Sequence, residues 1–266
     1  MKTKRKAMTR LFGDWYKSYA KLSRFFLALE QSNSRCIMYS KMFPGNNPNE
    51  EIFQRVFWAF APSTKGFTHC RLVLSIDGTH LHGKYKGTLL IAMGCDGNNQ
   101  LFPFAFAITE GENTDSWSWF LACIRVGVIQ RKGLCLISDC HPDIIAVVNE
   151  TYSGWTKPNA YYRFCMCHLA SNFNTKFKDK NLKDLMCRVA MESKDTIGRI
   201  NAEAINWLEH IPLKKWALSH DGERRYEIMT TNMSEVFNGV LKGARNLPIT
   251  TLVQLTLLHS QVRAWC

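Results

Sequence analysis

The chain has 266 residues and a formal net charge of +12, from 34 Lys and Arg against 22 Asp and Glu. Its hydrophobic content of 46%, with 12% aromatic residues, indicates an ordinary globular protein with enough apolar surface for one large or two small domains. The excess of positive charge favours a polyanionic partner, and nucleic acid is the first candidate.

Membrane and secreted classes are disfavoured. No apolar run approaches the roughly 18 residues that a membrane-spanning helix needs, and the N-terminus lacks the apolar core of a secretory signal. The ten cysteines have no scaffold-like spacing, which indicates a reduced compartment where most of them are buried hydrophobes. We therefore expect a soluble intracellular protein with no membrane partner.

The N-terminal part is expected to be helical. Residues 1–10 form a basic arm, which is a nuclear address, a phosphate-contacting tail or simply a solvated terminus. Residues 11–70 make up an N-terminal helical region in this interpretation. Apolar residues recur at helical steps over 11–29, and residues 51–60 predict a short helix that ends before Pro62.

From residue 71 the pattern becomes that of an α/β protein with a mixed sheet and flanking helices. Apolar runs predict strands at 71–77, 88–95, 101–109, 134–139 and 160–164. The second and third strands should form an antiparallel hairpin. Helices are expected to begin near Thr114 and at Pro142, so the fourth strand is reached by a crossover connection. Residues 71–164 are thus the first part of the core.

The remaining chain is expected to be helical throughout. Residues 165–231 predict an all-helical insertion, and residues 232–266 return to the core as its C-terminal helices. Lysines and acidic residues alternate in the insertion, which favours a solvated helix face slightly over a nucleic-acid groove.

Two aspartates close buried strands. Asp77 and Asp139 each follow an apolar run, and strands lying side by side would bring both carboxylates to one edge of the sheet. Adjacent carboxylates repel unless a cation lies between them, so a pair of Mg²⁺ or Mn²⁺ ions would suit them. Locally, Asp77 before Gly78 is equally typical of a turn, and Asp139 could cap the helix behind Pro142.

A third acid is needed to complete such a metal site. The candidates are Glu192, Glu203, Glu209 and Glu235. Glu235 has the strongest local pattern, because it shares one helix face with Asn238 and Lys242. Alternatively, Glu235 completes a capping box that starts at Asn232 and reaches back to a backbone N–H group.

Six motifs in chain order resemble the transposase domain of plant Mutator-like elements. They are IDGTHLHGKYKG (76–87), DGNNQ (96–100), DSWSWFL (115–121), SD (138–139), RFCMCHL (163–169) and TNMSEVFN (231–238). The resemblance extends from about residue 51 to residue 262. It implies an RNase H-like core of the DDE type, with Asp77, Asp139 and Glu235 as the catalytic, metal-binding acids. The helical insertion then separates the second aspartate from the glutamate.

Other residues also match the family. Its Cys-x-x-His signature falls on Cys165 and His168, which would have a structural role or supply two zinc ligands. Further candidates for DNA contact are His80, Lys84, Lys86, Asn238 and Lys242. The sequence departs from the family pattern after Asp139, where Cys140–Asp143 stands in place of an early basic residue.

The leading functional prediction is a transposase core that cleaves DNA at element ends and transfers the strand. Within these residues there is no Cys/His-rich module, so we expect a catalytic core without its DNA-reading parts. One alternative is a silent transposase remnant, or a domesticated protein that binds DNA or a regulatory partner. A weaker one is an unrelated two-metal phosphohydrolase. We further expect a homo-oligomer located in the nucleus.

Overall fold

The computed structural model describes residues 10, 13–32, 36–47, 51–84, 86–98, 100–191, 201–229 and 232–263. The side chains of Leu101, Asn232, Met233, Glu235 and residues 261–263 lie outside the described part.

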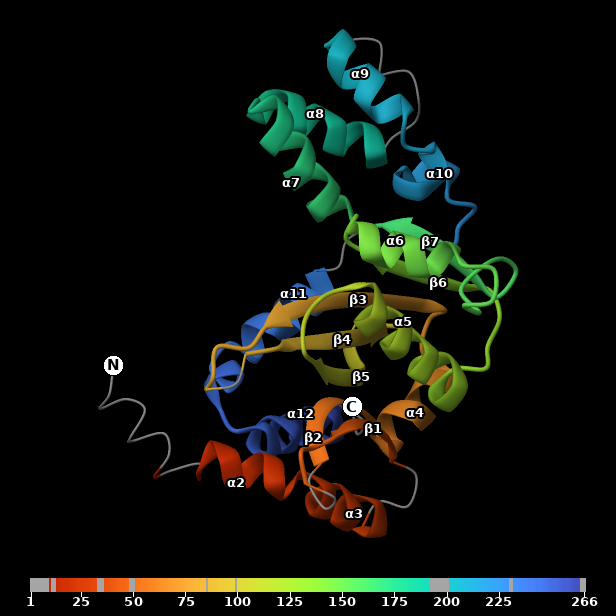
Figure 1. Ribbon diagram of the computed structural model, residues 1–266. Coiled ribbons are helices and arrows are strands. Elements are labelled where there is room, and N and C mark those ends of the chain that lie inside the picture. The colour runs from red at the N-terminus through yellow and green to blue at the C-terminus, as the bar shows by residue number, and fades with distance from the viewer. Residues whose placement is uncertain are drawn as a thin grey trace.

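A seven-stranded mixed sheet forms the centre of the protein, in the order β1-β2-β5-β4-β3-β6-β7 (Figure 1). Its strands are β1 (Ile37–Pro44), β2 (Glu51–Ala59), β3 (Val73–His80), β4 (Thr88–Cys95), β5 (Leu101–Thr109), β6 (Leu134–Ser138) and β7 (Ala160–Phe164). Neighbours from β1 to β3 pair antiparallel, whereas β3, β6 and β7 run parallel. The predicted hairpin and crossover connection are confirmed.

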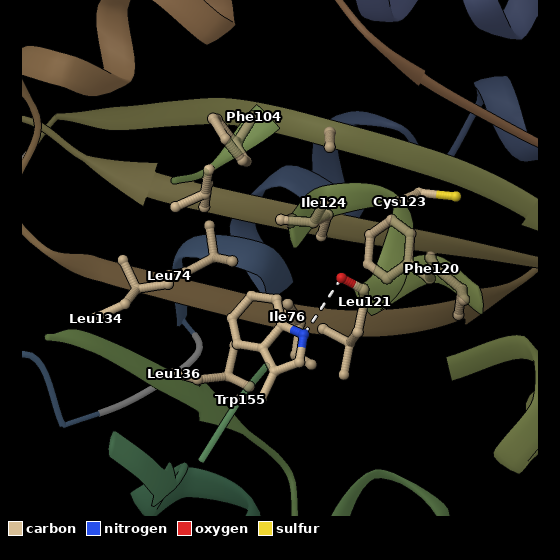
Figure 2. Close-up of a cluster of buried hydrophobic side chains, with 14 of the residues drawn as sticks. Leu74, Ile76, Phe104, Phe120, Leu121, Cys123, Ile124, Leu134, Leu136 and Trp155 are labelled. Atoms are coloured by element: carbon tan, nitrogen blue, oxygen red, sulfur yellow. Dashed lines mark hydrogen bonds between the residues drawn. The ribbon is translucent and has the colours of Figure 1, made fainter. Parts of the chain in front are cut away.

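Helices cover one face of the sheet around a large apolar core. They are α4 (Ala61–Gly66), α5 (Thr114–Cys123), the π-helical turn η2 (Ile124–Val128) and α6 (Pro142–Asn149). Figure 2 shows Leu74 and Ile76 of β3 facing side chains of α5 and η2. The indole N–H of Trp155 donates a hydrogen bond of 3.2 Å to the carbonyl of Leu121, which ties the segment after α6 to α5.

A second core lies on the opposite face. It is formed with α2 (Trp15–Ala20), α3 (Leu22–Ser32), α11 (Asn232–Val240) and α12 (Ile249–Arg263). The buried indole of Trp58 in β2 donates to the Thr256 hydroxyl of α12 at 3.0 Å. Because both faces are covered, the central strands read as almost continuous apolar runs.

The segment after β7 is helical and has a core of its own. It comprises α7 (Met166–Phe177), α8 (Lys180–Met191), α9 (Ala202–Glu209), α10 (Leu213–Trp216) and the 3₁₀ turn η4 (Leu218–His220). Figure 1 shows these helices beyond the β6–β7 edge of the sheet. Within the described ranges, no helix is long and apolar enough to cross a membrane.

The N-terminal prediction needs correction. Residues 51–60 do not form a helix, because Glu51–Ala59 is strand β2 between β1 and β5. Val56 and Trp58 enter one core, whereas Phe57 and Ala59 enter the other, which is the alternation of a strand buried on both faces. Strand β1 was missed as well. The division of the chain into units stays a prediction.

Candidate active site

The two predicted aspartates lie at the same edge of the sheet. Strands β3 and β6 pair in parallel, with Ser75 opposite Ile137. Continuing this register by two residues sets Asp77 beside Asp139, and the Asp77 side chain lies on the face that carries α11, as that of Ser75 does. The Asp139 carboxylate is close enough to raise the pKa of Asp77. The expected juxtaposition of the two carboxylates is therefore present.

Helix α11 packs on β3 through two hydrogen bonds. The buried hydroxyls of Ser234 and Ser75 are 2.8 Å apart. One turn further on, the side-chain amide of Asn238 donates to Asp77 Oδ2 at 2.7 Å. Asn238, predicted as a candidate DNA contact, thus holds the first aspartate. The backbone of Glu235 lies on this helix, one residue after Ser234 and three before Asn238.

Asp77 carries an elevated pKa. Burial is the main cause and raises the pKa of its carboxyl from 3.8 to about 7, with smaller contributions from the carboxylates of Asp139 and Glu112. The imidazole of His168 and the N–H group of Gly78 oppose this rise. Without a metal ion beside it, this carboxyl group is half protonated near neutral pH.

Glu112 is an acid of this cluster that the sequence analysis missed. It lies in the turn between β5 and α5, and its carboxylate covers Gly78: a Cβ atom on that glycine would lie 2.9 Å from Glu112 Oε1. Burial and then Asp139 raise the pKa of Glu112, while His141 and His80 counteract them. The glycine after Asp77 therefore makes room for a further carboxylate.

The direction of the strands indicates that Glu112 lies near Asp77. Strand β5 runs in the same direction as β3, because each is antiparallel to β4. The turn after β5 consequently reaches the sheet edge where Asp77 lies. An acid placed directly after that strand, as Glu112 is, was a candidate on this ground.

The Cys-x-x-His signature brings a cation to the carboxylates. Cys165 precedes α7, and its N–H group donates to the carbonyl of Ser138 at 2.6 Å, next to Asp139. A side-chain hydrogen bond to Cys165 and the charge of Cys165, with smaller contributions from Asp77 and Asp139, raise the pKa of His168 to about 9, while burial opposes the rise. The imidazole is therefore protonated at neutral pH and compensates part of the negative charge.

Asp139 is held by its surroundings. Its Oδ1 accepts the N–H group of His141 at 3.1 Å, and its carbonyl accepts the hydroxyl of Tyr162 at 3.1 Å. His141 is the N-cap of α6, with its Nδ1 3.4 Å from the N–H group of Asp143. The alternative in which Asp139 caps that helix is thus wrong.

Basic side chains lie around this edge. His80, Lys84 and Lys86 are exposed at the end of β3 and in the loop that follows, and Lys242 is exposed just after α11. Arg245, which the sequence analysis did not single out, donates to the hydroxyl of Thr79.

The other candidate acids contribute less. Glu203 and Glu209 are exposed on α9, which packs in the separate helical core, and Glu192 lies outside the described residues. In the described part, which does not include the Glu235 side chain, no three His, Cys, Asp or Glu side chains are placed to hold a metal ion.

Comparison with known proteins identifies the segment that carries this site. Residues 73–172, from β3 into α7, match the family model described as the MULE transposase domain. A stretch of 121 residues is 22% identical to Protein FAR1-RELATED SEQUENCE 6 of Arabidopsis thaliana, and it covers 46% of this chain but 16% of that protein. The matched segment includes both aspartates and the Cys-x-x-His signature and ends before α11. The resemblance drawn from the motifs is confirmed over residues 73–172, the segment that is similar to the MULE transposase domain.

Proposed function

We propose that this chain is a transposase catalytic core of the DDE type, which cleaves DNA and transfers the strand with the help of divalent metal ions. The observation that supports it most directly is the placement of Asp77 beside Asp139 on parallel strands, with α11 docked on Asp77. In this proposal the sheet is an RNase H-like core. The helices between β7 and α11 are its insertion, and Glu235 is the third acid.

The donor set suits a hard divalent cation. Carboxylate oxygens are the ligands that Mg²⁺ and Mn²⁺ prefer. Burial and neighbouring acids raise the pKa of Asp77, and a bound metal ion would lower it by stabilising the ionised carboxylate. Asp77, Asp139 and Glu235 would hold the metal. When bound, it supplies an activated water and charge stabilisation at the leaving oxygen.

The chain's own residues prepare the site. Asn238 fixes one oxygen of Asp77, and the His141 N–H group fixes one oxygen of Asp139, so both carboxylates are oriented in advance. The end of β3 lies at this edge of the sheet. There His80 and Lys242 provide exposed positive or protonatable groups for phosphates.

Nicking of supercoiled plasmid DNA tests this function without knowledge of the element ends. We expect nicking with Mg²⁺ or Mn²⁺ and none with EDTA. Asp77→Asn and Glu235→Gln should abolish it. Asp184→Asn, which removes an exposed carboxylate from α8, is the matched control and should keep full activity. Full metal-dependent activity in Asp77→Asn would rule out the mechanism.

A second candidate is a catalytically silent protein that binds DNA as a regulator. It is favoured by the groups that stabilise the aspartates without metal, namely the amide of Asn238, which donates to Asp77, and the positive charge of the His168 imidazole. DNA binding without products, even with Mn²⁺ over long incubation, would support it.

An unrelated phosphohydrolase of small substrates is a weaker candidate still. Salt dependence tests it, since only a DNA-binding protein is expected to lose affinity steeply as salt rises. Homo-oligomerisation, a nuclear location and zinc at Cys165 and His168 stay predictions.

A further inference from the structure

A group of cations lines the β7 edge of the sheet. We name it the β7 cation cluster, and its members are Lys157, Arg163, Lys214, Lys215 and Arg224. They come from the loop before β7, from β7 itself, from α10 and from the loop after η4. Figure 1 shows α10 beside β7 at this edge. Lys157, Lys214 and Arg224 are exposed, whereas Arg163 is buried.

Aromatic rings of β7 hold the cluster together. Three cations surround the ring of Tyr161: Arg224 at 4.2 Å, Lys157 at 5.6 Å and Arg163 at 6.0 Å from its centroid. Contact between a cation and the face of an aromatic ring is favourable, and it orders long side chains that are otherwise mobile. The ring of Tyr161 therefore arranges positive charge at the start of the strand.

The cluster continues toward the end of β7. Lys215 Nζ lies 4.5 Å from the ring centroid of Tyr162 and 5.9 Å from that of Phe164. Buried Arg225 fixes this arrangement, because it donates to the carbonyls of Phe164, at 3.0 Å, and of Lys215, at 2.5 Å. Burial and the charges of neighbouring cations lower the pKa of Lys215 to about 8.

Among the described residues, no carboxylate makes an ion pair with any cation of the cluster. Asp221 is the nearby buried acid, and its two oxygens accept the N–H groups of Glu223 and Arg225 at 2.6 and 3.0 Å. Like charges gathered on a rigid scaffold repel one another, and a bound anion relieves that repulsion.

The position of the cluster indicates which anion. Strand β7 runs parallel to β6, and Phe164 pairs with Ser138, the residue before Asp139. The cations therefore follow a strand that ends beside the candidate active site, and they span about 10 Å at roughly 3.3 Å per residue from Tyr161 to Phe164. A chain of phosphates has this kind of extended, repeated negative charge.

We propose that the β7 cation cluster binds the phosphodiester backbone of duplex DNA and leads that DNA to the carboxylates. The need for a polyanion follows from the cluster alone, while the choice of DNA rests on the proposed function. Exposed Lys157, Lys214 and Arg224 make the phosphate contacts. Lys215 and buried Arg163 add to the field behind them.

The test measures binding separately from catalysis. A fluorescein-labelled DNA duplex of arbitrary sequence is titrated with protein in EDTA at several salt concentrations, so no cleavage contributes. The test variant is Lys157→Gln with Arg224→Gln, and its matched control is Lys17→Gln with Lys21→Gln. The control removes the same charge from exposed positions on and after α2, at the other end of the molecule (Figure 1). Unfolding curves confirm that both variants are folded.

We expect the cluster variant to bind at least about tenfold more weakly at moderate salt, with a salt slope lower by about 2, since each phosphate contact contributes about 0.9. The control should change affinity by less than about twofold, since its residues make no contact. Equal affinities and slopes in the two variants would overturn the proposal, as would wild-type protein that does not bind the duplex. A cluster variant that loses binding to polyglutamate but not to DNA would also overturn it, in favour of an acidic protein partner.

These outcomes differ from a failure of the proposed catalysis. Wild-type protein that binds through the cluster and never nicks plasmid DNA would refute the catalytic proposal alone.

Discussion

Replacing Asp77 by Asn should make the metal-free protein more stable, although it removes a proposed catalytic residue. The carboxyl group has a pKa of about 7 in the folded protein, against 3.8 ordinarily, mainly because it is buried. Ionising it in the folded state therefore costs free energy. Asn is neutral, and its side-chain carbonyl is still able to accept the Asn238 amide.

The sign and size follow from linkage. The folded protein holds this proton more tightly than the unfolded chain, so the free energy of unfolding falls as pH rises from about 4 to about 7 and then levels off. At about 1.4 kcal/mol per pKa unit, the full difference corresponds to about 4 kcal/mol. Asp77 retains some solvent access, so we expect about half, or about 2 kcal/mol, in favour of Asn at pH values above about 8.

Urea denaturation in EDTA checks this expectation. The stability advantage of Asp77→Asn should be less than about 1 kcal/mol near pH 5 and grow to about 2 kcal/mol near pH 8. Asp184→Asn should stay within about 0.5 kcal/mol of wild type at both values. Added Mg²⁺ should stabilise wild type but not Asp77→Asn. An Asn variant that is less stable near pH 8, or an advantage that does not vary with pH, would refute the reasoning.

Three further changes probe the packing around the site. Gly78→Ala should displace the Glu112 carboxylate toward solvent, so that its pKa, followed by NMR titration, falls toward the ordinary range; an unchanged pKa would count against the close contact. Ser234→Ala should cost about 1–2 kcal/mol in urea denaturation, because the buried Ser75 hydroxyl loses its partner. Part of that loss should return in the double alanine variant. Arg225→Leu should cost about 3 kcal/mol, seen as a lower thermal midpoint, since two buried carbonyls lose their donor.

Much of the sheet was predictable because its central strands are buried on both faces. The apolar runs that became β3, β4, β5, β6 and β7 are bounded by turn residues, and no helical periodicity competes with them. The run that became β2 was different, because its apolar side chains also fit a short helix. Only pairing with the preceding strand β1 and with β5, which is distant in sequence, decides between the two structures.

The sequence did not predict strand β1 for another reason. It is an edge strand whose side chains are largely exposed or half-buried, including Tyr39 and Phe43, so burial left little periodic signal in its sequence. This strand is defined by its backbone hydrogen bonds to β2. The pattern of side chains in the sequence does not predict such backbone pairing.

The candidate site likewise has residues that the sequence predicts and residues that only the tertiary structure reveals. Asp77 and Asp139 were accessible to sequence reasoning, because each ends an apolar strand and parallel neighbours align their ends. The partner of Asp77 was not, since Asn238 reaches it from a helix that follows the whole helical segment, and its placement depends on the tertiary contact between Ser234 and Ser75. Asn238 was interpreted as facing DNA, because a helix face shows which residues go together but not what they face.

Gly78 shows how such a contact shapes a site. A glycine after a strand aspartate suggests a turn, yet Gly78 continues strand β3 and pairs with Leu90. The missing side chain instead leaves space for Glu112, which lies against the strand from the opposite face to α11. Asp77 is consequently enclosed by Asn238 on one side and by a second carboxylate on the other. Its high pKa is therefore a consequence of the topology, since β5 and α11 both bring their residues to the edge where β3 ends.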